Sequence, residues 1–244
     1  MTRTRLDKLV LERGLAPTRE KAQALILAGQ IHINGRRADK AGMPVPADAQ
    51  VELVGEPPRY VGRGGIKLEG ALEDFSLDPT GKICLDIGSS TGGFTDCLLQ
   101  HGAARVYAVD VGKGQLDWKL RQDARVVVRE GINARHLKPE DIGEPVDWVT
   151  LDVAFISVAK ILPAALACAR PGATFLILVK PQFELSQKQV GKGGIVRDPA
   201  LHREAVEKVS QAAVEVDLGE IQVRESRLPG AEGNREFFLC ARRR

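Results

Sequence analysis

The feature that most constrains this fold is a regular alternation of short apolar segments and amphipathic segments from residue 60 onward. Apolar runs of strand length recur with helical stretches between them. This alternation predicts a parallel sheet with helices on both faces. The predicted strands cover 83–87, 105–110, 125–129, 147–152 and 174–180. The predicted helices cover 66–74, 93–101, 114–121, 157–168 and 200–216.

Two further strands, 220–226 and 235–241, are predicted at the end of the chain. Pro229-Gly230 and Gly233-Asn234 lie between them and favour a turn, so the two strands are expected to form a terminal hairpin. The last strand would then run antiparallel to the others. The sheet is therefore predicted to have seven mostly parallel strands in an α/β domain that covers residues 60–244.

The first 54 residues predict a separate small α+β domain. Helices are expected at 4–13 and 17–28, and strands at 30–33 and 50–54. Asn34-Gly35 favours a tight turn after the first of these strands. Residues 55–59 contain two prolines and are expected to be a linker between the domains.

Positive charge is concentrated in the N-terminal module. Residues 1–50 hold nine Lys/Arg and five Asp/Glu, a net of +4, although the whole chain carries only +3. The remainder is therefore nearly neutral. A basic module of this kind suggests an anionic partner, of which nucleic acid is the simplest, although an ordinary solvated surface would also carry such charges.

A glycine-rich segment, Asp86–Phe94, follows the first strand of the large domain. Glycines allow a backbone to approach a ligand closely. The next strand ends at Asp110, where a carboxylate can accept hydrogen bonds from both hydroxyls of a ribose. The segment lacks the glycine spacing of a dinucleotide site and the Gly-Lys-Ser/Thr of a P-loop. A hydrolase interpretation with Ser90, Asp152 and His202 is disfavoured, because only one strand precedes the serine and His202 is expected to be solvated.

This segment resembles motif I of S-adenosylmethionine-dependent methyltransferases, which has an acid, a glycine turn and a second acid one strand later. The resemblance implies a Rossmann-like methyltransferase fold and S-adenosylmethionine as the cofactor. Asp110 would hold the ribose, Asn133 would lie near the adenine, and the motif I residues would contact the methionine part. The implied cofactor-binding residues are Asp86, Gly88, Ser89, Gly92, Phe94, Asp110, Val111, Asn133 and Asp152.

Four charged residues, Lys67, Asp152, Lys180 and Glu236, are predicted to meet at one edge of the sheet. Asp152 and Lys180 end parallel strands, whose carboxyl ends share the ligand-binding edge. Glu236 would reach this edge if the last strand is antiparallel. Lys67 is expected to open the helix that follows a flexible Arg63-Gly64-Gly65. Because a lysine at the end of a buried strand needs a partner, unrelated surface charges are the weaker explanation.

Such a set suits the activation of a hydroxyl group. A ribose 2′-hydroxyl is a poor nucleophile, whereas a methyl sulfonium is a strong electrophile and needs no metal. Catalysis then depends on alignment and on stabilising the charge that grows on oxygen. Lys180 is predicted to lie at that oxygen, oriented with Lys67 by the two carboxylates. Lys180 as a neutral base and Lys180 as an electrostatic stabiliser that loses its proton late both remain consistent with the sequence.

The tetrad order Lys–Asp–Lys–Glu resembles the FtsJ-like ribose 2′-O-methyltransferases, and nearly the whole chain resembles the TlyA/hemolysin A family. That family methylates cytidine ribose in ribosomal RNA of the large subunit and sometimes also the small subunit. Ala154 departs from the serine expected there. The supporting segments are Arg63–Leu68, Ser90–Thr95, Val111–Leu116, Asn133–Arg135, Asp152–Ser157, Lys180–Glu184 and Gly233–Phe237.

The N-terminal module resembles an S4 RNA-binding domain in three segments, Arg5–Asp7, Thr18–Ala22 and Gly29–Gly35. The resemblance implies ribosomal RNA or ribosomal subunits as partners, contacted through phosphates. Basic residues of the methyltransferase domain are also expected to contact the RNA. The predicted RNA-binding residues are Arg3, Arg5, Lys8, Arg19, Lys21, Arg36, Arg63, Arg135 and Lys188.

Other function classes are disfavoured by what the sequence lacks. It has no apolar run long enough to span a membrane and no apolar stretch at its start, so a cytoplasmic enzyme is expected. Cys84, Cys97, Cys168 and Cys240 lack metal-ligand spacing and are expected to be buried free thiols without a metal. A non-catalytic RNA-binding protein and a membrane-active hemolysin remain as weaker alternatives, and the oligomeric state is left open.

Overall fold

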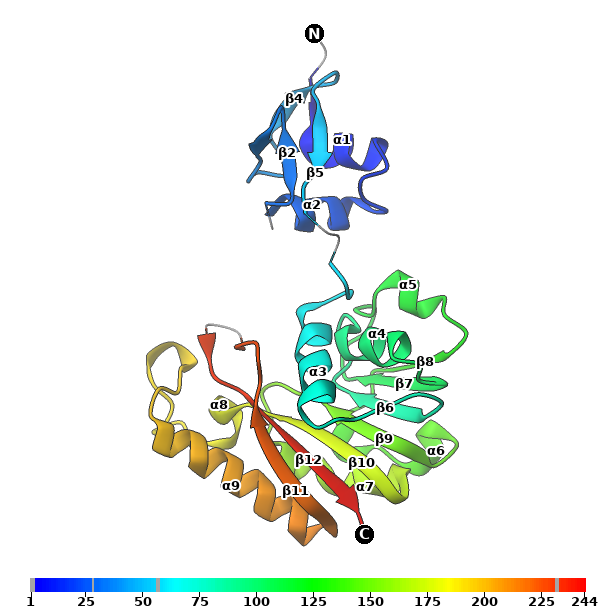
Figure 1. Cartoon of the computed structure of the whole chain (residues 1–244), viewed down its shortest axis with the longest axis vertical. Helices are drawn as coiled ribbons and strands as arrows, with labels where there is room; N and C mark the ends of the chain where they lie inside the picture. The colour runs from blue at the N-terminus through cyan, green and yellow to red at the C-terminus, as the bar shows by residue number, and fades with distance from the viewer. Residues whose placement is uncertain (1–2, 28, 56–57, 231–232) are drawn as a thin grey trace. The chain divides into compact units, whose positions relative to one another are not determined.

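The chain forms two compact units in the computed structural model, divided between Pro57 and Pro58 (Figure 1). The structure describes residues 3–27, 29–55, 58–230 and 233–244. The predicted linker 55–59 therefore lies partly outside the described residues, as does Ala28 at the predicted end of the second helix.

The N-terminal unit packs two helices against two small sheets around one apolar core. Asn34 (φ 49°) and Gly35 (φ 74°) both adopt left-handed conformations, as the tight turn predicted here requires. A pairing of Arg3–Arg5 with Pro44–Pro46 was not predicted, because its partner strands lie 41 residues apart. The elements are β1 (Arg3–Arg5), α1 (Leu6–Glu12), α2 (Arg19–Leu27), β2 (Ile31–Ile33), β3 (Arg36–Arg37), β4 (Pro44–Pro46) and β5 (Val51–Leu53).

The C-terminal unit alternates strands with helices. Its described strands are β6 (Ile83–Ile87), β7 (Arg105–Asp110), β8 (Val126–Glu130), β9 (Val146–Leu151), β10 (Ala169–Val179), β11 (Leu218–Glu225) and β12 (Phe237–Arg243). Its described α-helices are α3 (Arg63–Asp74), α4 (Gly93–Gln100), α5 (Trp118–Arg121), α6 (Pro139–Ile142), α7 (Leu162–Cys168), α8 (Pro181–Glu184) and α9 (Pro199–Glu215). Short 3-10 turns occur at η1 (Ala134–His136), η2 (Val158–Lys160) and η3 (Lys192–Gly194).

The strands form one seven-stranded sheet in the order β11-β12-β10-β9-β6-β7-β8. Strands β6 to β10 are parallel, whereas β12 runs antiparallel to both β10 and β11. The predicted α/β fold and the terminal hairpin are confirmed. The hairpin inserts β12 between β10 and β11, so the start of β12 lies at the carboxyl edge of the parallel strands.

Alternating strand residues build a separate core on each face of the sheet. Cys84 and Val106 pack on the face covered by α3, α4 and α5, and Leu85 and Tyr107 pack on the face covered by α6, α7 and α9 (Figure 1). This two-sided burial explains why the central strands are apolar at nearly every position. All four cysteines are buried free thiols, as predicted.

Three predicted helices differ from the structure. Arg63-Gly64-Gly65 is the first turn of α3 rather than a flexible segment, so Lys67 lies in the second turn instead of opening the helix. The helix expected at 114–121 shrinks to α5, because Gly114 is left-handed (φ 73°). The helix expected at 157–168 is divided into η2 and α7, and Pro163 lies in the first turn of the new helix.

Close packing explains why glycine occurs in the first turn of α3. A Cβ at Gly65 would lie 2.3 Å from the Tyr60 ring, and a Cβ at Gly93 of α4 would lie 2.9 Å from the Gly65 nitrogen. Glycine is therefore needed where α3 packs against α4. None of the described helices is both long and apolar enough to cross a membrane.

We predict that Gly65→Ala lowers the free energy of unfolding by about 1–3 kcal/mol, because the added methyl group must displace a packed aromatic ring. Gly70→Ala in the same helix is the matched control. Its Cβ would meet only the flexible side chain of Arg227 at 3.0 Å, and alanine favours a helix by about 1 kcal/mol over glycine. Urea unfolding measures both variants. Equal stability of the two variants would contradict this role for Gly65.

Candidate active site

The glycine loop after β6 is fixed to the end of β9. Gly88 has φ 85°, and a Cβ there would lie 2.3 Å from the carbonyl oxygen of Asp152. The Asp152 backbone N–H donates to the Ile87 carbonyl at 2.9 Å. Ser90 (φ 48°) and Gly92 (φ 99°) are also left-handed before α4 begins at Gly93. The loop predicted to hold a cofactor is thus joined directly to one member of the predicted tetrad.

Asp86, in the strand that leads into this loop, helps to hold the loop in place. Its side chain is fully buried and accepts hydrogen bonds from Thr95 Oγ1 at 2.6 Å and Thr150 Oγ1 at 3.0 Å. Burial raises the pKa of Asp86 to about 7 despite these hydrogen bonds. Neither Asp86 nor Gly92 lines the cavities described below, and Leu116 and Leu120 cover Gly92. The cofactor contacts of these two residues therefore stay a prediction.

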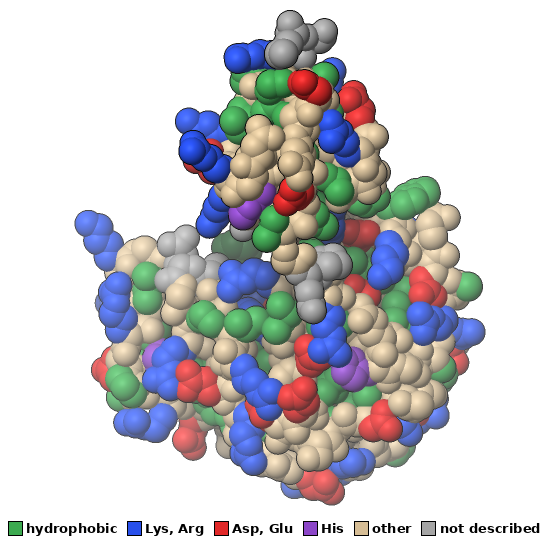
Figure 2. All heavy atoms as spheres, turned by 45° about the horizontal axis from the view of Figure 1, so that its top comes forward, with side chains coloured by type: hydrophobic (Ala, Val, Ile, Leu, Met, Phe, Trp, Pro, Cys, Tyr) green, Lys and Arg blue, Asp and Glu red, His purple; other side chains and the backbone are tan. Residues whose placement is uncertain are grey.

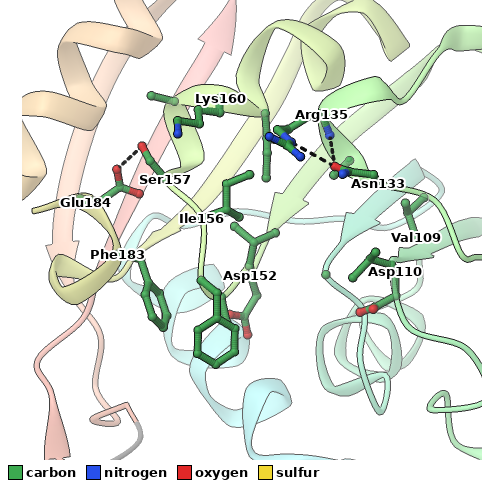
Figure 3. Close-up of a pocket in the computed structure, with 18 of the residues that line it drawn as sticks. Val109, Asp110, Asn133, Arg135, Asp152, Ile156, Ser157, Lys160, Phe183 and Glu184 are labelled. Atoms are coloured by element: carbon green, nitrogen blue, oxygen red, sulfur yellow. Dashed lines mark hydrogen bonds between the residues drawn. The ribbon is translucent and has the colours of Figure 1, made fainter. Parts of the chain in front are cut away.

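A cavity of about 1170 Å³ opens at the carboxyl edge of the sheet (Figure 3). Five of the predicted cofactor residues line it, from four consecutive strand ends and the loops that follow them. A smaller neighbouring cavity of about 130 Å³ shares Gly88 and Asp152 with it and is lined by Ser89 and Phe94. The five residues of the large cavity are Gly88, Asp110, Val111, Asn133 and Asp152.

Asp110 and Asn133 are held in place by nearby backbone groups. The Asp110 carboxylate accepts hydrogen bonds from Ser90 N at 2.8 Å and from Gly112 N at 2.7 Å. Each of its oxygens retains a further lone pair for a ligand. Asn133 Oδ1 accepts from the backbone N of Arg135 at 3.1 Å and from its Nε at 3.4 Å (Figure 3). These contacts fix the side chains on the wall of the cavity.

The four tetrad residues form two ion pairs at this edge. Lys180 Nζ lies 2.5 Å from Asp152 Oδ1, and Lys67 Nζ lies 2.6 Å from Glu236 Oε2. Their side chains are only 2–21% exposed. Pairing partly offsets the cost of removing these charges from water, which explains why each lysine has a carboxylate beside it.

Strand pairing brings three of the four residues to the same edge of the sheet. Val179 pairs with Phe237, so Lys180 and Glu236 extend the same register by one residue. Leu151 pairs with Ile177 on the other side of β10, which places Asp152 at the same edge. Lys67 enters from α3, which packs against α4. Two ammonium groups and two carboxylates therefore border the end of β10, where they can orient and stabilise a reacting oxygen.

Three cavity residues were missed by the sequence reasoning. Phe155 is 91% exposed with φ 64°, and its ring centroid lies 5.2 Å from that of Phe183. Glu184 is buried and accepts from Ser157 Oγ at 2.5 Å and Val158 N at 2.8 Å, while burial raises its pKa. Glu184 thereby ties α8 to the loop that carries Phe155 (Figure 3). The available signal was an aromatic residue three positions after Asp152, in the loop that leaves β9.

The predicted RNA-binding residues occur in both units. Arg63, Arg135 and Lys188 are exposed in the C-terminal unit, and Arg135 lines the large cavity. In the N-terminal unit Lys21 is half-buried, whereas the others are exposed: Arg3, Arg5, Lys8, Arg19 and Arg36. Figure 2 shows Lys and Arg side chains on the surface of this unit.

His202 differs from its predicted exposure. It is buried, its Nε2 hydrogen-bonds the Val196 carbonyl at 2.9 Å, and its ring packs near Phe237. The cavity that it lines is a different one from the cavity shared by Ser90 and Asp152. The structure therefore gives no support to a serine hydrolase triad. The described residues include no His, Cys, Asp and Glu group arranged to hold a metal ion.

Two family models match the chain. Residues 60–243 match the FtsJ-like methyltransferase model, and residues 4–51 match the S4 domain model. Both matches agree with the division of the chain into a small N-terminal unit and a larger C-terminal unit.

Relatives resemble the chain over nearly its full length. It is 48% identical to the 16S/23S rRNA (cytidine-2′-O)-methyltransferase TlyA of Mycobacterium tuberculosis, covering 98% of this chain and 90% of that protein. It is 50% identical to YqxC of Bacillus subtilis, provisionally named an rRNA methyltransferase, over 96% and 84%. A solved structure of a provisionally named hemolysin from Streptococcus thermophilus has 43% identity and a TM-score of 0.78, covering 100% and 89%.

We predict that Asp86→Asn changes how stability depends on pH. In the native protein the buried carboxyl keeps its proton up to about pH 7, whereas an unfolded aspartate loses it near 3.8. The cost of charging Asp86 is therefore absent below about pH 4 and grows as pH rises to 7. The stability of the variant relative to wild type should rise by more than about 1.4 kcal/mol across that range. Urea unfolding at a series of pH values measures this, and parallel pH profiles would contradict it.

Proposed function

The chain belongs to the FtsJ-like methyltransferase family, and on that premise we propose that it methylates the 2′-oxygen of cytidine ribose in ribosomal RNA with S-adenosylmethionine. The single observation that carries the proposal is the double ion pair at the carboxyl edge, Lys180–Asp152 and Lys67–Glu236, beside a large cavity. The name of the TlyA relative supports the cytidine ribose as the target, in large-subunit RNA and also in the small subunit.

The residues around the cavity suit S-adenosylmethionine. The cavity volume of about 1170 Å³ lies above the range of about 300–1,000 Å³ that is usual for small-molecule sites, which leaves room for part of a nucleotide substrate as well. Asp110 offers free lone pairs to ribose hydroxyls, and Asn133 borders the region for the adenine. Gly88 and the smaller cavity would receive the methionine part. When bound, S-adenosylmethionine supplies an electrophilic methyl group on sulfonium sulfur.

The chain's own residues would act on the ribose oxygen. The Lys180 ammonium, oriented by Asp152, places a positive charge and N–H donors where negative charge develops during attack. Lys67, oriented by Glu236, supplies a second donor from α3. Because both lysines are largely buried, their interaction with a developing oxyanion is screened little by water. The ribose oxygen gains the methyl group as the methyl–sulfur bond breaks, and late in the step Lys180 passes a proton to the Asp152 carboxylate and accepts the hydroxyl proton in its place. Asp152 then releases its proton to water.

Phe155 suits the base of the target nucleotide. Its backbone is left-handed, which is costly for a bulky residue and is found most often at functional sites, and its exposed ring is available to a ligand. The ring projects from the loop that follows Asp152, and stacking on aromatic side chains is a common way to hold an unpaired base. We therefore place the cytosine against Phe155 while its ribose faces Lys180.

Phe155→Ala should raise the KM for ribosomal RNA by roughly tenfold or more, because stacking contributes about 1–3 kcal/mol per base. Phe155→Tyr retains a ring and should stay near wild type. S-adenosylmethionine affinity, measured by calorimetry, should be similar in all three proteins. An unchanged KM for Phe155→Ala would remove this residue from the substrate site.

Lys180→Met should lower the rate of methyl transfer at saturating substrates by roughly 100-fold or more, since one donor to a developing oxyanion is worth that much. Lys82→Met, at the opposite end of the sheet before β6, is the matched control and should retain the wild-type rate. Single-turnover assays with purified ribosomal subunits measure both. Full activity in Lys180→Met would show that the role assigned to Lys180 is wrong.

A further inference from the structure

A buried carboxylate in the N-terminal unit is paired with two exposed arginines. Asp7, in the first turn of α1, has a side chain that is 0% exposed. It accepts hydrogen bonds from Arg5 Nε at 3.0 Å, Arg5 Nη2 at 2.9 Å, Arg19 Nε at 2.9 Å and Gln23 Nε2 at 2.9 Å. Its Oδ1 also accepts from the backbone N of Lys8 at 3.0 Å. The Arg5 guanidinium lowers the pKa of Asp7, which therefore stays ionised.

These bonds hold two arginines beside each other without using all of their donors. Arg5 Nη2 and Arg19 Nε both lie 2.9 Å from Asp7 Oδ2, so these nitrogens are within about 6 Å of each other. The two arginine side chains remain 46% and 43% exposed. A guanidinium has five N–H donors, of which Asp7 takes two from Arg5 and one from Arg19. The remaining donors suit phosphate oxygens.

We propose that Asp7 is a positioning residue for RNA binding, which holds Arg5 and Arg19 as a preassembled pair for a backbone phosphate of the substrate RNA. The inference rests on the proposed function only in taking RNA as the partner. Holding two long side chains in one geometry before binding reduces the entropy lost on binding. The negative charge of Asp7 would thus strengthen the binding of an anion, because it orders the two cations.

A positioning role for Asp7 and simple charge attraction predict opposite effects of Asp7→Asn on RNA affinity. The substitution makes the protein more positive by one charge, so attraction alone predicts tighter RNA binding and a steeper salt dependence. Loss of the ordered pair predicts weaker binding, by roughly tenfold, and a salt slope that is shallower by about 1. Asp48→Asn is the matched control, because it adds the same charge at an exposed position of the same unit.

The experiment measures the Kd of the full-length protein for a fluorescein-labelled RNA hairpin by anisotropy at several KCl concentrations. Weaker binding by Asp7→Asn, with Asp48→Asn equal to or tighter than wild type, is the expected result. Tighter binding by both variants overturns the proposal. Thermal unfolding of each variant shows whether the N-terminal unit remains folded.

A second pair of variants decides the matter if Asp7→Asn does not fold. Arg5→Lys keeps the charge but loses the two-donor fork on Asp7, and Arg13→Lys makes the same change at an exposed position outside the predicted RNA-binding residues. The proposal predicts weaker RNA binding for Arg5→Lys only, and equal binding by both overturns it. These affinities are measured without methyl transfer, so an inactive wild-type enzyme would count against the proposed function and leave this comparison intact.

Discussion

The antiparallel pairing of β12 with β10 is the constraint on which the site depends. It turns the start of β12 toward the carboxyl edge of the parallel strands, so Glu236 lies one register step from Lys180. Without that reversal, Glu236 would lie at the opposite edge and Lys67 would lose its ion-pair partner. Both partners of each pair are needed because their side chains are largely buried, and an unpaired lysine at these positions would strongly destabilise the fold.

A second constraint joins the cofactor side of the site to the reactive side. Gly88 packs against the Asp152 carbonyl so closely that a methyl group would not fit, and Asp152 N bonds the strand that leads into the loop. The glycine loop and the Lys180–Asp152 pair are therefore positioned by the same contact. Asp86 accepts hydrogen bonds from Thr95 of α4 and Thr150 of β9, and so links the elements on either side of the loop. The geometry needed to align two reactants is built into the fold.

Local patterns predicted much of this arrangement. Asp110, Asp152 and Lys180 were placed correctly at the sheet edge because each directly follows an apolar strand. Long-range packing was harder to predict: Gly64 and Gly65 suggested flexibility, although they serve the close contact of α3 with α4. Asp86 was predicted to contact the cofactor, and its burial and its hydrogen bonds from two threonines were not predicted. No role was predicted for Phe155 or Asp7. Residue spacing does not reveal the left-handed backbone of Phe155, nor that Asp7 is buried and shared by two arginines.

The two ion pairs at one sheet edge would activate a ribose hydroxyl for methylation. The most direct test incubates the purified protein with S-adenosylmethionine carrying a labelled methyl group and with ribosomal subunits, and analyses the digested RNA by mass spectrometry. The label should be found in 2′-O-methylcytidine. Label on a base carbon or nitrogen, or no transfer to RNA at all although S-adenosylmethionine binds, would contradict it.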